Sequence, residues 1–501
     1  MLFNSYEFIF VFLPAAVLIH FAAARWSVEA AIAATALSSL AFYAWWNPPF
    51  VVLLGGSILV NFVLASRMAR VEKATARVLL ICGIVVNLAV LVYFKYAAFL
   101  LSIVRGGAAL PPNVPLALSF TTFVQIAFLT DMYRRRTNPP FGQYALFVAF
   151  FPHLIAGPIV RWSNLGRQLP DPARYRLDWD NVALGLTIFV LGLAKKVLIA
   201  DQLAPHVGVV FDAAARGDPL TALAAWAACF GFSAQIYFDF SGYSDMAVGL
   251  GLLFNYRLPI NFAAPLRATN ALDFWRRWHI TLSQFLRDFV YGPLTFGRPA
   301  LWWRAIAIMI TMVLAGLWHG AGWPFVLWGA FHGVLLLVNV AWHMLPKPGR
   351  PSAAGRFAGW ALTFTAFAAS SVFFRGTDMG AIAHMLTAMA GRGAGAFAVP
   401  ESYEWAVRSG YSAQVWLQAL SGLPWFSVGM VWIAGALAVA LLVPDTMELV
   451  GYREGEVQSA WRRVAPFAWR PSPAMLGAAV VLFAAVFYGL GRVSEFLYFQ
   501  F

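Results

Sequence analysis

The residue most suited to chemistry is His319, within the apolar segment GLWHGAGWPFVLWGAFHG at residues 316–333. Two glycines and a proline follow it closely, at positions 320, 322 and 324, and this pattern predicts that a helix ends there. A buried imidazole beside such a break could take the proton from an alcohol. Acyl transfer to a hydroxyl group requires that proton transfer, so His319 is our first candidate for a general base.

A second candidate, His279, lies in the segment NALDFWRRWHITLSQFLRDFVYGPL at residues 270–294. It falls on an apolar stripe at helical spacing that includes Trp275, Trp278, Leu282, Phe285, Leu286 and Phe289. Arg276 and Arg277 lie off this stripe, so we predict one amphipathic helix at a membrane surface or half sunk into it. His279 on its inward face would act as a neutral hydrogen-bonding group, or else it is a buried structural histidine.

Two carboxylates, Asp239 and Asp245, interrupt the otherwise apolar segment 231–254. If this segment is helical, they lie on one face, within about 120° of arc. Carboxylates at membrane depth normally face a bundle interior or a wet cavity, because burying them in lipid is costly. They would therefore line a cavity, or pair with a lysine such as Lys195 or Lys196 to hold helices together.

We interpret His332, thirteen residues after His319, as a helix-packing histidine. These two histidines lack the i, i+4 spacing of a helical zinc pair, and no cysteine lies near them in the sequence. A serine motif of the G-x-S-x-G type is also absent from the sequence. We therefore predict no metal site, and any acyl chemistry would have to rest on histidine.

The elements that carry these residues are predicted to be membrane helices. Of the 501 residues, 61% are hydrophobic and 11% are charged, whereas soluble domains contain roughly 25% charged residues. This composition excludes a water-soluble fold. Apolar stretches of about 20 residues recur along the chain, so we predict roughly 11 or 12 transmembrane helices plus re-entrant or interfacial helices. They would form one all-α membrane domain over residues 1–501.

The apolar run before His319 sets the predicted depth of the helix break. As a helix, the run from Arg304 to Trp318 would be about 22 Å long, whereas a hydrocarbon core is about 30 Å thick. The turn after His319 would therefore lie within the membrane. Irregular backbone is tolerated there only where protein or a water-filled cavity surrounds it.

Clusters of basic residues set the predicted orientation. Arg67–Arg77 and Arg134–Arg136 lie between apolar runs, so the positive-inside rule places both in the cytoplasm and the N-terminus outside. The formal net charge of +13 resides mainly in such clusters, so we predict no nucleic-acid partner. The proline-containing segment 150–160 is predicted to be re-entrant or interfacial, and residues 391–422 are predicted to form an external cap.

Several long motifs together resemble the membrane-bound O-acyltransferase family, and within it the alginate O-acetylation branch. They are MLFNSYEFIFVFLP at the N-terminus, FFPHLIAGPIVR at 150–161, the stretch from YFDFSGYSDMAVG to TLSQFLRD at 237–288, GLWHGAGWPFVLWGAFHG and the terminal SEFLYFQF. The resemblance runs from end to end of the chain, with its core motifs at 231–333.

The resemblance implies a helical bundle around a central tunnel, with a donor-binding mouth on the cytoplasmic side and an acceptor-facing mouth outside. The family's near-invariant histidine falls on His319, as the acid/base acting on the acceptor hydroxyl. A second catalytic position falls on His279, which would help to position the donor. Candidate tunnel-lining residues without assigned chemistry are Asp239, Tyr243, Asp245, Trp278 and Trp318. Arg276 and Arg277 would attract the phosphates of the donor.

The resemblance also implies what the protein works with. The donor would be acetyl-CoA, a substrate rather than a permanently bound cofactor, and the acetyl group would cross the bacterial inner membrane for O-acetylation of an exported, alginate-like polysaccharide. Periplasmic acetyltransferase partners would place the group on the polymer. One alternative is the same fold with another acceptor, such as teichoic acid, a lipid or a protein. The other is a secondary transporter, which Asp239 and Asp245 suggest but which leaves the GLWHG motif unexplained.

Overall fold

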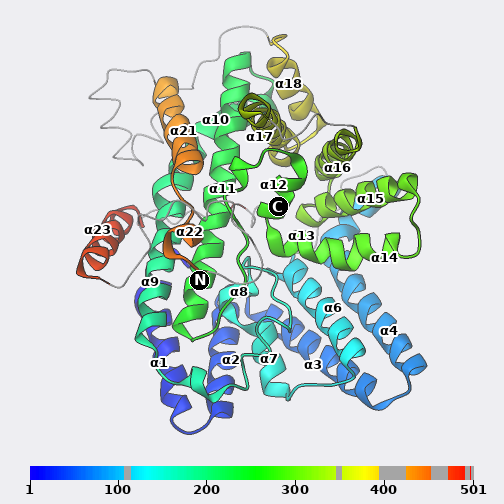
Figure 1. The fold of residues 1–501 in the computed structure, drawn as a ribbon, viewed down its shortest axis with the longest axis vertical. Coiled ribbons are helices and arrows are strands. Elements are labelled where there is room, and N and C mark those ends of the chain that lie inside the picture. The colour runs from blue at the N-terminus through cyan, green and yellow to red at the C-terminus, as the bar shows by residue number, and fades with distance from the viewer. Residues whose placement is uncertain (106–113, 346–351, 394–424, 453–471, 491–496, 498–501) are drawn as a thin grey trace. The chain divides into compact units, whose positions relative to one another are not determined.

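A computed structural model of the chain describes residues 1–105, 114–345, 352–393, 425–452, 472–490 and 497 (Figure 1). The regular structure within these ranges is helical, and none of their residues forms a β-strand. The all-α prediction is therefore confirmed. Most of the external cap predicted at 391–422 lies outside the described residues, as does the terminal motif SEFLYFQF apart from Leu497.

Among the described residues, seven helices are long and apolar enough to cross a membrane, and the chain is a multi-pass membrane protein. They are Glu7–Ala24, Pro48–Arg70, Lys73–Val104, Trp179–Arg216, Leu301–His319, Trp323–Met344 and Ala353–Arg375. Shorter apolar helices are Val28–Ala44, Met379–Met389, Val428–Leu442 and Pro473–Gly489. The prediction of 11 or 12 crossings was made for the whole chain, whereas these seven and the four shorter helices all lie in the part that the structure describes.

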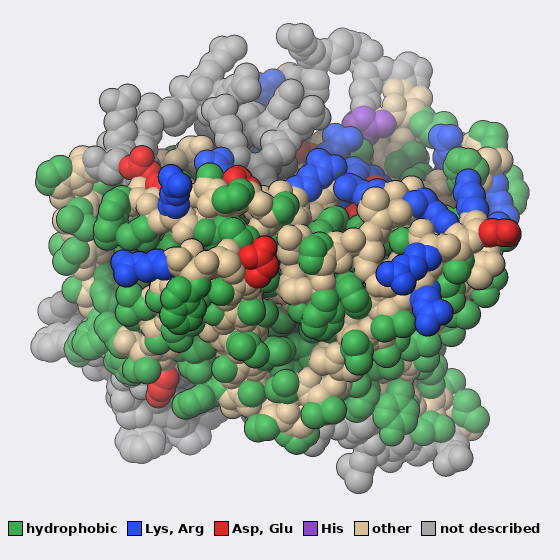
Figure 2. Space-filling view, turned by 90° about the horizontal axis from the view of Figure 1, so that it is seen from below, with side chains coloured by type: hydrophobic (Ala, Val, Ile, Leu, Met, Phe, Trp, Pro, Cys, Tyr) green, Lys and Arg blue, Asp and Glu red, His purple; other side chains and the backbone are tan. Residues whose placement is uncertain are grey.

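The surfaces of these helices are apolar, as contact with lipid requires. Leu18, Leu37 and Val52 expose 70%, 67% and 78% of their surface. Figure 2 shows hydrophobic side chains over much of the face that it draws, with charged side chains on a smaller part of it. Apolar surface of this kind is typical of a membrane protein and rare on a soluble monomer.

The helices fall into two compact units. Of the described residues, those within 1–193, 243–261 and 446–497 form the first unit, and those within 194–242 and 262–445 form the second. The long helix α11 (Ala222–Leu253) contributes its first part to the second unit and its last part to the first unit. The assignment of the whole chain, residues 1–501, to one membrane domain stays a prediction.

The first unit contains the N-terminal helices, which pack around a cluster of aromatic rings. Its elements, besides the end of α11, are η1 (Glu7–Phe12), α1 (Leu13–Ala24), α2 (Val28–Ala44), α3 (Pro48–Arg70), α4 (Lys73–Leu91), η2 (Val92–Tyr96), α5 (Ala97–Arg105), α6 (Leu118–Arg135), α7 (Phe141–Ala149), α8 (Phe151–Leu154), η3 (Pro172–Tyr175), α9 (Trp179–Ala194), α22 (Thr446–Val450) and α23 (Pro473–Gly489). The rings of Phe3, Phe8 and Phe42 pack together, with centroids 4.8–5.8 Å apart. Ser27 begins α2 by accepting a hydrogen bond from the backbone N–H of Ala30.

Neutral polar side chains also join helices of this unit. Asn61 on α3 and Asn87 on α4 exchange two hydrogen bonds, with donor–acceptor distances of 2.7 and 3.3 Å. Such bonds between membrane helices contribute about 0.6–2 kcal/mol. Segment 150–160 is buried and contains only the four-residue helix α8, so it does not form a spanning helix.

The second unit carries the candidate chemistry. Its elements, besides the start of α11, are η4 (Lys195–Ala200), α10 (Asp201–Arg216), η5 (Pro265–Arg267), α12 (Ala271–Arg277), α13 (Ile280–Leu286), η6 (Arg287–Tyr291), α14 (Gly292–Thr295), α15 (Leu301–His319), α16 (Trp323–Met344), α17 (Ala353–Arg375), α18 (Met379–Met389) and α21 (Trp425–Leu442). Helices α15 and α16 form a hairpin joined by residues 320–322.

The single amphipathic helix predicted at 270–294 is wrong. The structure has two helical runs there, α12 and the continuous run from α13 through η6 to α14. His279 lies at the break between them with a φ of +43°, a left-handed conformation that a continuous right-handed helix cannot contain. The apolar spacing continues across the break, which is why periodicity alone did not reveal it.

Candidate active site

His319 is the last residue of α15, and the chain is extended immediately after it. Gly320 and Gly322 have φ values of −160° and −177°, and α16 begins at Trp323. The predicted helix break is therefore confirmed. Because α15 begins at Leu301, before Arg304, it is about 28 Å long. That length nearly matches a hydrocarbon core, so helix length does not by itself place the turn within the membrane, contrary to our expectation.

Two glycines bring α15 and α16 into backbone contact near His319. A Cβ atom on Gly316 would lie 2.1 Å from the carbonyl oxygen of Phe325, and one on Gly329 would lie 2.3 Å from that of Met312. Real Cβ atoms essentially never approach another atom within 3.0 Å. Glycine is therefore required at both positions for this crossing, as at other small-residue contacts between membrane helices. The crossing determines where the end of α15 lies relative to α16.

Aromatic rings enclose the imidazole of His319. Its ring centroid lies 4.8 Å from that of Trp318, 4.9 Å from that of Trp328 on α16 and 5.1 Å from that of Phe374 on α17. The residue is only 4% exposed. The imidazole is thus held among three rings and shielded from bulk water. Electrostatic interactions and hydrogen bonds are stronger in such a buried place than in water.

His279 packs into the same aromatic cluster. Its ring centroid lies 5.7 Å from that of Trp318, and Phe240 on α11 meets it edge-on with centroids 4.7 Å apart. His279 lies between α12 and α13, and neither of these is among the helices long enough to span a membrane. Burial lowers the pKa of His279 to about 3. The imidazole is therefore neutral near pH 7, as a general base or hydrogen-bond acceptor must be.

The two predicted tryptophans lie differently in this cluster. Trp318 contacts both His279 and His319, so the two predicted catalytic histidines share one aromatic neighbour. Trp278 instead stacks on Phe274, with centroids 5.6 Å apart and an interplanar angle of 16°. A tunnel-lining role for either tryptophan stays a prediction.

His332 has the surroundings expected of a helix-packing residue. Its Nε2 lies 3.1 Å from the Ser370 hydroxyl, and that hydroxyl donates to the carbonyl oxygen of Phe367 at 2.7 Å. Ser370 must therefore accept the hydrogen bond from His332, which requires the proton on Nε2. The bond links α16 to α17, in agreement with our interpretation of this histidine.

The predicted carboxylates and Tyr243 separate along α11. Asp239, in the second unit, lies 2.6 Å from the Nζ atom of Lys196, so the ion-pair interpretation is confirmed for this residue. Tyr243 and Asp245 belong to the first unit, where the ring of Tyr243 stacks on Phe3 with centroids 4.7 Å apart. A tunnel-lining role for Asp239, Tyr243 and Asp245 stays a prediction.

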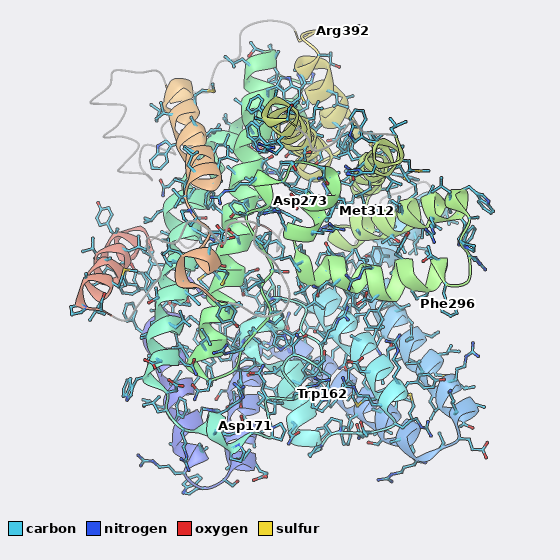
Figure 3. All side chains as sticks on the ribbon, viewed as in Figure 1. Trp162, Asp171, Asp273, Phe296, Met312 and Arg392 are labelled. Carbon is cyan, nitrogen blue, oxygen red and sulfur yellow. The ribbon has the colours of Figure 1, made fainter. Side chains whose placement is uncertain are left out.

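The two candidate donor-binding arginines also differ. The Nε atom of Arg277 donates to Asp273 one helical turn earlier, at 2.8 Å, and Figure 3 labels Asp273 on α12. Arg276 is exposed. Arg277 is therefore engaged in its own helix, whereas Arg276 is the more accessible cation. Binding of donor phosphates by either residue stays a prediction.

Sequence reasoning missed the rings that hold the two histidines, namely Phe240, Trp328 and Phe374. No sequence signal distinguishes them, because aromatic residues make up 16% of the chain. Within the described ranges, no group of three or more His, Cys, Asp or Glu side chains could hold a metal ion. The imidazoles of His279 and His319 are both buried here, and an imidazole in such a place can exchange a proton with a bound reactant.

One family model and several known proteins match this chain. The model of the membrane-bound O-acyltransferase family matches residues 115–374, which include all three histidines described above. The chain is 38% identical over 425 residues to the peptidoglycan O-acetyltransferase of Helicobacter pylori, which covers 78% of this chain and 80% of that protein. It is 38% identical over 406 residues to the probable alginate O-acetylase AlgI of Azotobacter vinelandii, covering 78% of each. A teichoic acid D-alanyltransferase of Streptococcus thermophilus is 29% identical over 241 residues, covering 45% of this chain and 57% of that protein.

Proposed function

Since this chain belongs to the membrane-bound O-acyltransferase family and is an acyltransferase, we propose that it moves an acetyl group from a cytoplasmic donor across the bacterial inner membrane. The acetyl group serves the O-acetylation of an exported polysaccharide. Membership of this enzyme family removes the secondary transporter from consideration.

The shared packing of His279 and His319 on Trp318 is the observation that carries this proposal. In the proposed reaction, His319 takes the proton of the attacking hydroxyl as its oxygen bonds to the thioester carbonyl carbon. The carbon–sulfur bond then breaks, and the imidazolium returns the proton to the departing thiolate. His279 stays neutral and positions the reacting group beside His319.

Relatives support the choice of substrates. Two of them are named for O-acetylation of peptidoglycan and of alginate, so the final acceptor class is a glycan hydroxyl. The donor is acetyl-CoA, whose phosphates suit an exposed cation such as Arg276. A periplasmic acetyltransferase partner completes the transfer to the polymer. Teichoic acid D-alanylation is the second candidate, because a D-alanyltransferase aligns with 45% of this chain at 29% identity.

The test is to replace His319 by glutamine, which keeps a hydrogen-bonding side chain but cannot act as the base. We expect His319→Gln and His319→Ala to lower the O-acetyl content of the exported polymer by about 10²–10⁴-fold. Expression and monodispersity in detergent should stay close to those of the wild type. Full acetylation by His319→Gln would mean that His319 is a packing residue and that the mechanism is wrong.

A further inference from the structure

A buried ion-pair cluster lies next to the candidate site and has no part in the proposed chemistry. The Nζ atom of Lys196 lies 2.6 Å from Oδ1 of Asp239 and 2.9 Å from Oδ1 of Asp201. The side chains of these three residues are 5%, 2% and 11% exposed, in that order. Taking such charges out of water costs several kcal/mol per ion. A cluster of this kind is weak evidence for stability, and a role in specifying geometry is the hypothesis that we pursue for it.

The two ion pairs of the cluster hold different parts of the unit. Lys196 lies on the π-helical segment η4, and Asp201 begins α10, which follows η4 directly. The pair between them therefore stays within one continuous stretch of chain. Asp239 lies on α11. Of these two ion pairs, the one between Lys196 and Asp239 ties α11 to η4, beside the contact of the Lys195 Nζ atom with the ring of Tyr237 on α11, 6.0 Å from its centroid.

Helix α11 presents other residues to the candidate site. The ring of Phe240 meets His279 edge-on at 4.7 Å, and the ring of Tyr237 lies 6.5 Å from that of Trp278. Around a helix, Asp239 is about 100° from Phe240 and about 160° from Tyr237. The ion pair therefore lies on one face of α11, and Phe240 and Tyr237, which contact the break between α12 and α13, lie on another face of the same helix.

We propose that Lys196 and Asp239 are positioning residues for acyl transfer, because their ion pair fixes α11 and thereby the ring of Phe240 against His279. This inference rests on the role of His279 in the proposed function. His279 is in a left-handed conformation between two helices, so its ring orientation depends on neighbours from elsewhere in the unit. Misplacing a reacting group by about 1 Å can lower a rate by about 10²-fold.

A matched pair of variants tests the proposal. Asp239→Leu and Asp201→Leu each remove one carboxylate and leave Lys196 paired with the other, so the change in charge is the same. Only Asp239→Leu removes an ion pair between α11 and η4, and the contact of Lys195 with Tyr237 stays in both variants. We expect Asp239→Leu to lower kcat by about 10–10²-fold and Asp201→Leu to lower it by less than about threefold. The KM for acetyl-CoA should change by less than about twofold in both, since positioning affects the reacting geometry.

Two more variants make the test specific. Asp239→Asn keeps an oxygen that accepts a hydrogen bond from Lys196, so it should retain most of the turnover that Asp239→Leu loses. Phe240→Leu leaves the ion pair intact and removes the ring edge from His279, so it should reproduce the loss of kcat. This variant also tests the proposal if Asp239→Leu does not accumulate in the membrane.

The measurement is the rate of O-acetyl incorporation into the polymer at increasing acetyl-CoA. Membranes are taken from a deletion strain that produces each full-length variant with its native partners, and rates are normalised to the amount of chain. Equal losses in the two leucine variants, or normal turnover in Asp239→Leu or Phe240→Leu, overturn the positioning role. His279→Ala is assayed in the same experiment. If it is impaired, any of these outcomes overturns the positioning role of Lys196 and Asp239 but leaves the proposed role of His279 standing. A fully active His279→Ala overturns both this inference and the proposed role of His279.

Discussion

Replacing Gly329 by alanine adds one methyl group at the crossing of α15 and α16. The new Cβ atom would lie 2.3 Å from the carbonyl oxygen of Met312 and 2.8 Å from the Cα atom of Val313. Both neighbours are backbone atoms of α15, so neither can rotate away as a flexible side chain can. Ordinary contacts begin at 3.4 Å, and the two helices must therefore separate locally by about 1 Å.

The expected effect has two parts. Overpacking of this kind costs typically about 1–3 kcal/mol of stability, so the thermal unfolding midpoint in detergent should fall. His319 ends α15, and a shift of about 1 Å at a reacting group can lower a rate by about 10²-fold. We therefore expect O-acetyl content of the polymer to fall by about 10–10²-fold, a larger effect than the loss of stability alone would produce.

Gly435 on α21 offers a matched control, because a Cβ atom there would have nothing within 4 Å. Gly435→Ala should keep full activity and be slightly more stable, since alanine favours a helix over glycine by about 1 kcal/mol. The assay compares thermal unfolding of each purified variant with acetyl content in the complemented strain. Normal acetylation and an unchanged midpoint in Gly329→Ala would refute the close-crossing explanation of how His319 is placed.

Three further predictions concern His279, the membrane orientation and the amide pair of the first unit. His279→Ala should insert normally but acetylate the polymer at least about tenfold less than the wild type, and normal acetylation would leave His279 a structural role only. A cysteine at Arg70, in a Cys82→Ser chain, should resist an impermeant thiol reagent in intact cells because the loop is predicted to be cytoplasmic; labelling there would reverse the orientation. Asn87→Leu should lower the thermal midpoint by the equivalent of about 0.6–2 kcal/mol. The double variant with Asn61→Leu should lose less stability than the sum of the two single variants, and strict additivity would argue against a coupled pair.

The helix break at His319 could be predicted because its causes are local. Glycines at 320 and 322 and the proline at 324 disfavour a continuous helix whatever surrounds them, and the structure ends α15 at His319. The break at His279 could not be predicted in the same way. The residues around it include no glycine or proline and keep helical apolar spacing. Its left-handed conformation therefore depends on contacts with other parts of the second unit.

The sequence by itself determined that this is an all-α, multi-pass membrane protein, since hydropathy and backbone preference are properties of neighbouring residues. Its motifs also indicated the acyltransferase family and the histidines to examine. Only the tertiary structure decided that Asp239 pairs with Lys196, that Trp318 contacts both His279 and His319, and that Gly316 and Gly329 set the approach of α15 to α16. Apart from the contact between the sequence neighbours Trp318 and His319, these contacts join residues that are separated along the chain. They depend on how whole helices pack, which local preferences do not specify.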